Sequence, residues 1–138
     1  MYSAGESRLT AASATGIPQV VVPGCLDFTN WWVGQVPDRY RDREFFQYNV
    51  EILLMRTNAE EFGALGAMFG ERLRAAKGPV RVLIPTRGMS QVVGRKTYDL
   101  AGNARGSWDQ PETDRIFVET LGRHLPGDVI RGASLPYQ

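Results

Sequence analysis

The sequence predicts a single α/β domain of Rossmann-like type over residues 1–138, with helices packed in three layers on a mostly parallel sheet of about four strands. Three observations carry this prediction. Short apolar runs rich in β-branched residues alternate with longer stretches of helical periodicity. Residues 51–85 have the strand, helix, strand pattern of a parallel crossover. A length of 138 residues is sufficient for one hydrophobic core.

The composition is that of an ordinary globular domain, with 43% hydrophobic and 22% charged residues. The net charge of +1 lacks the basic surplus of a nucleic-acid-coating domain, so nucleic acid is not an expected partner. One cysteine excludes an internal disulfide, and with a single histidine it cannot form a zinc site, so no metal site is predicted. No apolar run has the length of a membrane span and no secretory signal is recognised, so we expect a cytoplasmic protein without a membrane partner.

The first third of the sequence predicts a helix, a strand and a long loop. Glu6–Thr15 has helical spacing, with Ser3 as the first member of a capping box. The β-branched run Val20–Val22 predicts a buried strand that ends in a tight turn. Asp27–Trp32 is expected to form a helical turn, and Gly34–Glu44 an irregular excursion. The aromatic side chains around this excursion could stack on a base, but an interface is the favoured interpretation.

The central segment gives the clearest prediction. Glu51–Arg56 and Val80–Pro85 are expected to be parallel strands joined by a right-handed crossover through a helix at Asn58–Lys77. Glu61 completes a capping box at the start of this helix. Gly66 lies on its apolar face, which predicts that the helix packs closely against the sheet.

The last third predicts a loop, a helix and a strand. Arg87–Gln110 is rich in glycine and is expected to be a second long loop, followed by a helix at Pro111–Leu125 and a strand at Asp128–Leu135. Three helices are few for a sheet that is buried on both faces, so the domain is expected to be truncated at both ends. We therefore expect exposed apolar surface that a second copy or a neighbouring domain covers.

Polar residues follow two of the predicted strands, where open α/β sheets bind their ligands. The predicted ligand-binding residues are Gly24, Asp27, Asn30, Thr86, Arg87, Gly88 and Ser90. Their hydroxyls, backbone amides and one guanidinium can donate to an anionic group. The alternative is that Asp27 caps the turn and forms a structural ion pair with Arg87. No catalytic residue is identified.

Two weaker candidates have structural interpretations. Asn58 follows the third strand and could receive a phosphate at a helix N-terminus, but its capping pattern favours a structural role. Cys25 is expected to be a small buried residue rather than a nucleophile. The only imidazole, that of His124, belongs to the last turn of a predicted helix, where a protonated imidazole interacts favourably with the helix dipole.

Three runs resemble the second half of the Tm-one-like ATP-binding domain family: GESRLTAASATGIPQVVVPGCLDFTNWW, VPDRYRDREFFQYN and LLMRTNAEEFGALGAMFGERLRAAKGPVRVLIPTRGMS. The PGCLD and PTRGMS segments are the most specific, and the resemblance covers nearly the whole chain. It implies two Rossmann-like subdomains in tandem, of which only the second is present here. It also implies ATP with magnesium as a cofactor. The glycine- and lysine-bearing motif that opens the family's first half has no counterpart in this sequence.

Three functions remain open from the sequence. The first is a binding module that holds a nucleotide or another small anionic ligand at the strand ends. The second is an assembly domain that forms a homo-oligomer or contacts a first-half subdomain. The third is an enzyme that acts on a small carboxylate or phosphate substrate.

Overall fold

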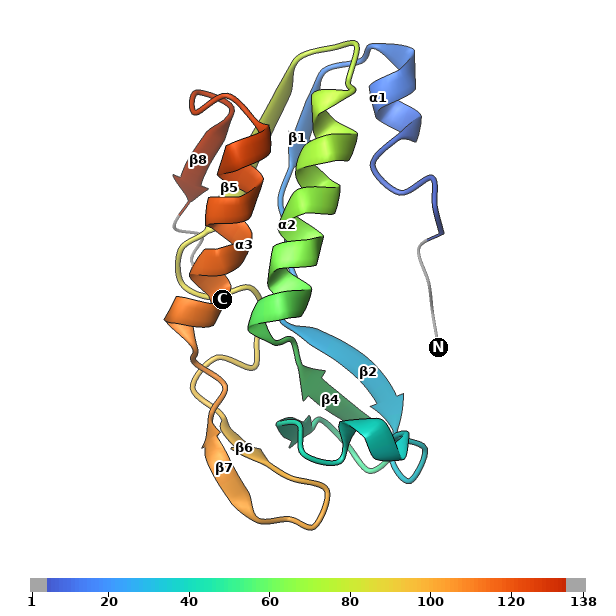
Figure 1. Cartoon of the computed structure of the whole chain (residues 1–138), viewed down its shortest axis with the longest axis vertical. Helices are drawn as coiled ribbons and strands as arrows, with labels where there is room; N and C mark the ends of the chain where they lie inside the picture. The colour runs from blue at the N-terminus through green and yellow to red at the C-terminus, as the bar shows by residue number, and fades with distance from the viewer. Residues whose placement is uncertain (1–4, 134–138) are drawn as a thin grey trace.

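The computed structural model describes residues 5–133 and confirms an α/β fold (Figure 1). The elements in chain order are α1 (Ala11–Thr15), β1 (Gln19–Val21), β2 (Phe28–Trp32), the 3-10 helix η1 (Asp38–Tyr40), β3 (Phe45–Gln47), β4 (Ile52–Arg56), α2 (Ala59–Arg74), β5 (Val80–Pro85), β6 (Lys96–Tyr98), β7 (Ala104–Ser107), α3 (Pro111–His124) and β8 (Ile130–Ala133).

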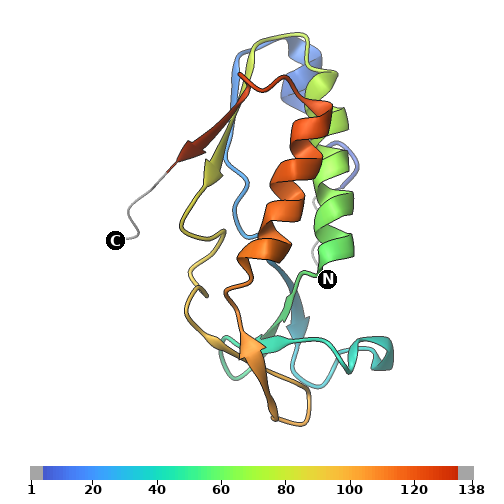
Figure 2. The ribbon, with the colours of Figure 1, turned by 60° about the vertical axis from the view of Figure 1, so that its left-hand side comes forward.

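The strands form two sheets instead of one. β1, β5 and β8 make a parallel sheet, and β2, β4, β3, β6 and β7 follow one another in an antiparallel sheet. The long helices α2 and α3 lie side by side on one face of the parallel sheet, and the antiparallel sheet lies beyond their N-terminal ends (Figures 1 and 2). The prediction of a single, mostly parallel sheet is therefore wrong. Within residues 5–133, both long helices cover the same face of the parallel sheet.

Residues 28–32 form a strand where a helical turn was expected. β2 pairs with β4 along its whole length, from Phe28 opposite Arg56 to Trp32 opposite Ile52. Aromatic and β-branched side chains favour this extended, half-buried conformation. The tertiary partner thus decides the structure of a segment whose own periodicity is too short to be diagnostic.

Residues 51–85 do not form a parallel crossover, although both strands and the helix between them are present. β4 is flanked on both sides by antiparallel partners, β2 and β3, whereas β5 pairs in parallel with β1 and β8. The hydrogen-bonding edges of β4 are therefore occupied, and it cannot join the sheet that contains β5. The sequence pattern identifies the strands but not the sheet to which each belongs.

Several boundaries also differ. The first helix begins at Ala11 rather than Glu6, because Leu9 has a positive φ of 70° that interrupts a right-handed helix. Ser3, and the end of the last predicted strand after Ala133, lie outside the described residues. The long loop at 87–110 contains the hairpin of β6 and β7. By contrast, the capping box of Asn58 and Glu61 at the start of α2 is confirmed.

The main core lies between the helices and the parallel sheet, and it includes Phe62, Leu73, Val82, Phe117 and Leu121. A smaller core around Leu54, Val92 and Trp108 belongs to the antiparallel sheet. Phe45, predicted to face an interface, is buried within the chain at 1% exposure.

Two glycines of α2 allow close contact with α3, not with the sheet as predicted for Gly66. A Cβ on Gly66 would lie 2.7 Å from the carbonyl oxygen of Phe117, and one on Gly70 would lie 2.3 Å from the Cβ of His124. The two helices therefore approach one another where they have no side chains to separate them.

The face of the parallel sheet opposite the helices carries exposed apolar side chains, as predicted. On β1 and just after it, Val20 is 66% and Val22 is 46% exposed. Their covering by a partner remains a prediction. None of the helices in the described part of the chain is both long and apolar enough to cross a membrane.

Substitution of Gly66 by Ala is expected to destabilise the protein by about 1–3 kcal/mol, because the new methyl group overlaps the backbone of α3. Gly63→Ala is the matched control on the same helix. Its Cβ would meet Ile116 at 3.8 Å, an ordinary contact, so helix propensity should stabilise this variant by about 1 kcal/mol. Urea unfolding measures both values. Equal stabilities of the two variants would contradict the close helix contact.

Candidate functional site

A cleft opens at the carboxyl end of β5, beside β8 and the first turns of α3. Its volume is about 530 Å³. We call it the strand-end cleft. Four of the seven residues predicted from the sequence line it: Asp27, Thr86, Arg87 and Gly88. The structure thus brings together groups from the segments that follow β1 and β5, as the strand-end argument predicts; their binding of a ligand remains a prediction.

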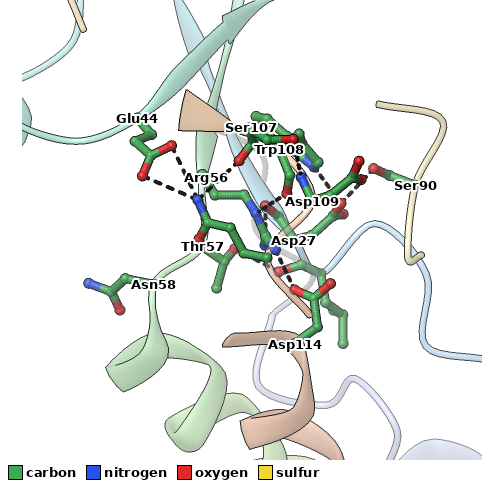
Figure 3. Close-up of polar contacts among 12 residues, drawn as sticks. Asp27, Glu44, Arg56, Thr57, Asn58, Ser90, Ser107, Trp108, Asp109 and Asp114 are labelled. Atoms are coloured by element: carbon green, nitrogen blue, oxygen red, sulfur yellow. Dashed lines mark hydrogen bonds and ion pairs between the residues drawn. The ribbon is translucent and has the colours of Figure 1, made fainter. Parts of the chain in front are cut away.

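Asp27 is a buried member of the cleft wall, with 2% of its surface exposed. Its Oδ2 accepts hydrogen bonds from the Ser90 hydroxyl at 2.6 Å and from the Trp108 indole N–H at 2.8 Å (Figure 3). Its Oδ1 is also buried and has no hydrogen-bond donor among the described residues. One oxygen of the carboxylate is therefore satisfied and the other is not.

Arg56, at the end of β4, lies beside Asp27 and is 3% exposed. Its guanidinium donates to the main-chain carbonyls of Asp27 at 3.3 Å and Trp108 at 3.1 Å, and to the carboxylate of Asp114 (Figure 3). The alternative ion pair between Asp27 and Arg87 is not formed in the described structure. The cation beside Asp27 is instead Arg56, which is buried and binds the main-chain carbonyl of Asp27 rather than its carboxylate.

Asp114 lies in the first turn of α3 and receives the guanidinium of Arg56. Burial raises the pKa of Asp114, and the opposing effect of Arg56 does not cancel it. Sequence reasoning missed Trp108 and Asp114. The signal for Trp108 is a large aromatic residue in a glycine-rich loop, whose indole N–H needs an acceptor once it is buried.

Arg87 is another residue that lines the strand-end cleft. Its side chain is exposed and forms no hydrogen bond or ion pair with residues 5–133. Gly88, next to it, has a φ of 106°, and a Cβ at this position would lie 2.2 Å from Val93. Both its conformation and its surroundings require glycine, so this turn determines how Arg87 is presented.

The other predicted site residues lie elsewhere. Asn30 and Ser90 line a second pocket of about 390 Å³, together with Trp32 and Tyr48. Ser90 nevertheless remains linked to the strand-end cleft through its hydrogen bond to Asp27. Gly24 lies at a further pocket, which is lined by α2 and by residues that precede α1. The predicted set therefore divides among separate surfaces.

Asn58 and Cys25 have the structural roles of a cap and a turn. The side chain of Asn58 accepts from the backbone N–H of Glu61, which confirms capping. Cys25 is exposed, so the prediction of a buried cysteine is wrong; its φ of 55° places it in a left-handed turn. Partial burial raises the pKa of the Cys25 thiol, and the charge of Asp27 adds to this effect. A reactive thiolate is therefore disfavoured.

No three or more His, Cys, Asp or Glu side chains between residues 5 and 133 are grouped so that they could hold a metal ion. Apart from Arg87 and Asp27, the charged groups that line the strand-end cleft are bound by other charged side chains or by the backbone. Asp114 is bound by Arg56, Arg115 by Glu112, and Asp109 accepts from the backbone N–H of Gly94.

Comparison with known proteins identifies similar chains. The model of the uncharacterised protein family UPF0261 C-terminal domain matches residues 1–138. A UPF0261 protein of Mesorhizobium japonicum is 39% identical over 123 residues, which cover 88% of this chain and 29% of the relative. A UPF0261 protein of Rhizobium meliloti is 37% identical over 130 residues, with coverages of 88% and 32%. The ToMV resistance protein Tm-1(GCR237) of Solanum lycopersicum is 31% identical over 97 residues, with coverages of 68% and 13%. The chain thus spans about a third or less of the length of these relatives.

Removal of the carboxylate of Asp114 is expected to destabilise the protein, because the buried guanidinium of Arg56 loses an acceptor. We expect a cost of about 1.5–3 kcal/mol for Asp114→Ala. Asp114→Asn should cost less, since its amide oxygen can still accept and burial already disfavours the charged carboxylate. Chemical denaturation measures the difference.

The control for Asp114→Ala is Glu112→Ala in the same helical turn. The ion pair of Glu112 with Arg115 is exposed, so its loss should cost less than about 1 kcal/mol. If both alanine variants lost the same stability, the burial of the Arg56 contact would have no energetic consequence.

Proposed function

The chain belongs to the UPF0261 family, whose C-terminal domain it matches over its whole length, and we propose that it binds a small anionic ligand in the strand-end cleft. The observation that carries the proposal is that Arg87, which lines this cleft, is exposed and forms no hydrogen bond or ion pair with the described residues. Guanidinium groups bind planar carboxylates and phosphates through paired hydrogen bonds.

The surroundings of Arg87 support an incoming anion. The other cation that lines the strand-end cleft, Arg115, is already paired with Glu112. Of the two arginines, only Arg87 therefore has all of its donors available to a ligand. The cleft also has the location at which open α/β sheets bind ligands, at the carboxyl end of a parallel strand.

The proposal extends to the nucleotide that the sequence resemblance implies. The parallel sheet with α2 and α3 would be the ligand-binding half of a Rossmann-like architecture, and the phosphates of ATP with magnesium would meet Arg87. A nucleotide is one member of the proposed ligand class; phosphorylated and carboxylated metabolites are others. The proposal concerns binding and names no reaction.

Arg87→Ala is expected to abolish the ligand-induced rise in melting temperature while changing the melting temperature of the free protein by less than about 2 °C, because the side chain is exposed and forms no hydrogen bond or ion pair with the described residues. A thermal-shift titration with inorganic phosphate, small phosphate esters and ATP with magnesium measures both quantities. Arg123→Ala, at the opposite end of α3, is the control and should bind like the wild type.

Two results would contradict this prediction. A large drop in the melting temperature of the free Arg87→Ala protein would make Arg87 a structural residue. Unchanged phosphate binding by this variant would place the anion site elsewhere.

A second function, assembly, is favoured by the exposed apolar face of β1. We propose that a second copy of the chain covers Val20 and Val22, which are exposed and flank Val21, a side chain that packs against the main core. Isolated exposed valines are common on proteins, but here Val20 in β1, Val22 just after it and Ile17 just before it are all exposed, and together they could begin an apolar patch.

Val20→Lys is expected to convert a dimer into a monomer, because burying a lysine in an apolar contact is costly. Sedimentation velocity across the micromolar range measures the mass. Val50→Lys is the control, because Val50 is 86% exposed in the turn between β3 and β4. A wild-type protein that stays monomeric throughout the range would remove the assembly proposal.

A further inference from the structure

We infer that the ligand of the strand-end cleft carries a hydrogen-bond donor beside its anionic group, and that this donor binds Oδ1 of Asp27. The inference rests on the proposed function, since it deepens the chemistry of the same cleft. It assigns to Asp27 the recognition of a hydroxyl or ammonium group, and to Arg87 the recognition of the anion.

The first step is the unsatisfied state of Oδ1. This oxygen is buried without a donor among the described residues, although Asp27 lines the cleft. A buried polar atom without a partner costs roughly 1–3 kcal/mol, so native structures rarely retain one without a reason. A ligand that supplies a donor would recover this cost on binding.

The second step is that the protein's own donors near Asp27 are committed. Ser90 and Trp108 both donate to Oδ2 and hold the carboxylate in one orientation. The guanidinium of Arg56, the nearest buried cation, donates to two main-chain carbonyls and to Asp114. It therefore leaves Oδ1 of Asp27 unsatisfied (Figure 3).

The third step concerns the route to this atom. Less than 1 Å² of Oδ1 is accessible, so a ligand donor reaches it only after the side chains that cover it move aside. The strand-end cleft is the side from which a ligand can arrive, because Asp27 is part of its lining. The cleft then offers a ligand two groups that have no partner among the described residues. The guanidinium of Arg87 can bind an anion, and Oδ1 of Asp27 can accept a hydrogen bond from a donor.

These two groups define a class of ligand. A phosphate or carboxylate on a small polyol meets the requirement through a hydroxyl, and a zwitterion meets it through an ammonium group. Both supply the same chemistry, an anion and a donor joined by a short linker. A simple alkyl phosphate supplies only the anion.

The test compares four probes: inorganic phosphate, methyl phosphate, glycerol 3-phosphate and O-phosphoethanolamine. Isothermal titration of the wild type should show that at least one of the two donor-bearing probes binds about tenfold or more tightly than methyl phosphate. Glycerol 3-phosphate and O-phosphoethanolamine distinguish a hydroxyl from an ammonium donor.

Asp27→Asn is the decisive variant. Its amide oxygen can accept from Ser90 and Trp108 as Oδ2 does, while its amide NH₂ replaces the acceptor Oδ1 with a donor. We expect this variant to bind the donor-bearing probe no more tightly than methyl phosphate, while its affinity for methyl phosphate stays within about twofold of the wild-type value. Asp128→Asn, at an exposed position before β8, is the control and should preserve the advantage.

An independent readout is the NMR signal of the Trp108 indole N–H. A donor that binds Oδ1 withdraws charge from the carboxylate that this indole contacts, so the signal should shift with the donor-bearing probe and not with methyl phosphate. This measurement uses the wild type and holds even if Asp27→Asn does not fold; Trp108→Phe assigns the signal.

The outcomes separate the two proposals. Equal affinities of methyl phosphate and both donor-bearing probes for the wild type, with an unmoved indole signal, would overturn the role of Asp27 and leave anion binding intact. An Asp27→Asn protein that folds and keeps the advantage would overturn it too. No binding of any probe would overturn the proposed function and this inference together.

Discussion

The guanidinium of Arg56 joins the antiparallel sheet to the start of α3 and to the loop between β1 and β2. It extends from the last residue of β4, in the antiparallel sheet, to the backbone of Asp27 and Trp108 and to the carboxylate of Asp114 at the start of α3. A buried charge is tolerated only when its donors are matched with acceptors. The position of α3 relative to the antiparallel sheet, and with it one wall of the strand-end cleft, therefore depends in part on this side chain.

Features encoded within a few residues could be predicted from the sequence. The capping box at Asn58 placed the start of α2 correctly, and the apolar runs at β4 and β5 identified strands. Pairing across long separations could not be predicted. β2 is a strand because it pairs with β4, and residues 27–32 alone do not indicate this pairing. The division of the strands between two sheets was not predicted for the same reason, since it depends on pairing between distant segments.

The site shows the same division. The strand-end rule brought Asp27 and Arg87 to one cleft, because it follows from sheet geometry and needs only the strands themselves. It also included Asn30, which faces another pocket once residues 28–32 are extended. Trp108 and Asp114 were missed because their contacts with Asp27 and Arg56 cross 52 or more residues of sequence. The exposed Arg87 owes its position to the glycine turn beside it, a local feature that the sequence does display.

The walls of the strand-end cleft come from widely separated parts of the chain, from Asp27 to Gly132. Contacts between such distant segments form only after long loops have closed, which makes folding slow in topologies of this kind. The complete cleft is therefore absent from any state in which β8 or α3 is undocked. A ligand that binds there would consequently stabilise the domain against global unfolding, and would slow the exchange of those core amides that exchange only when the domain unfolds.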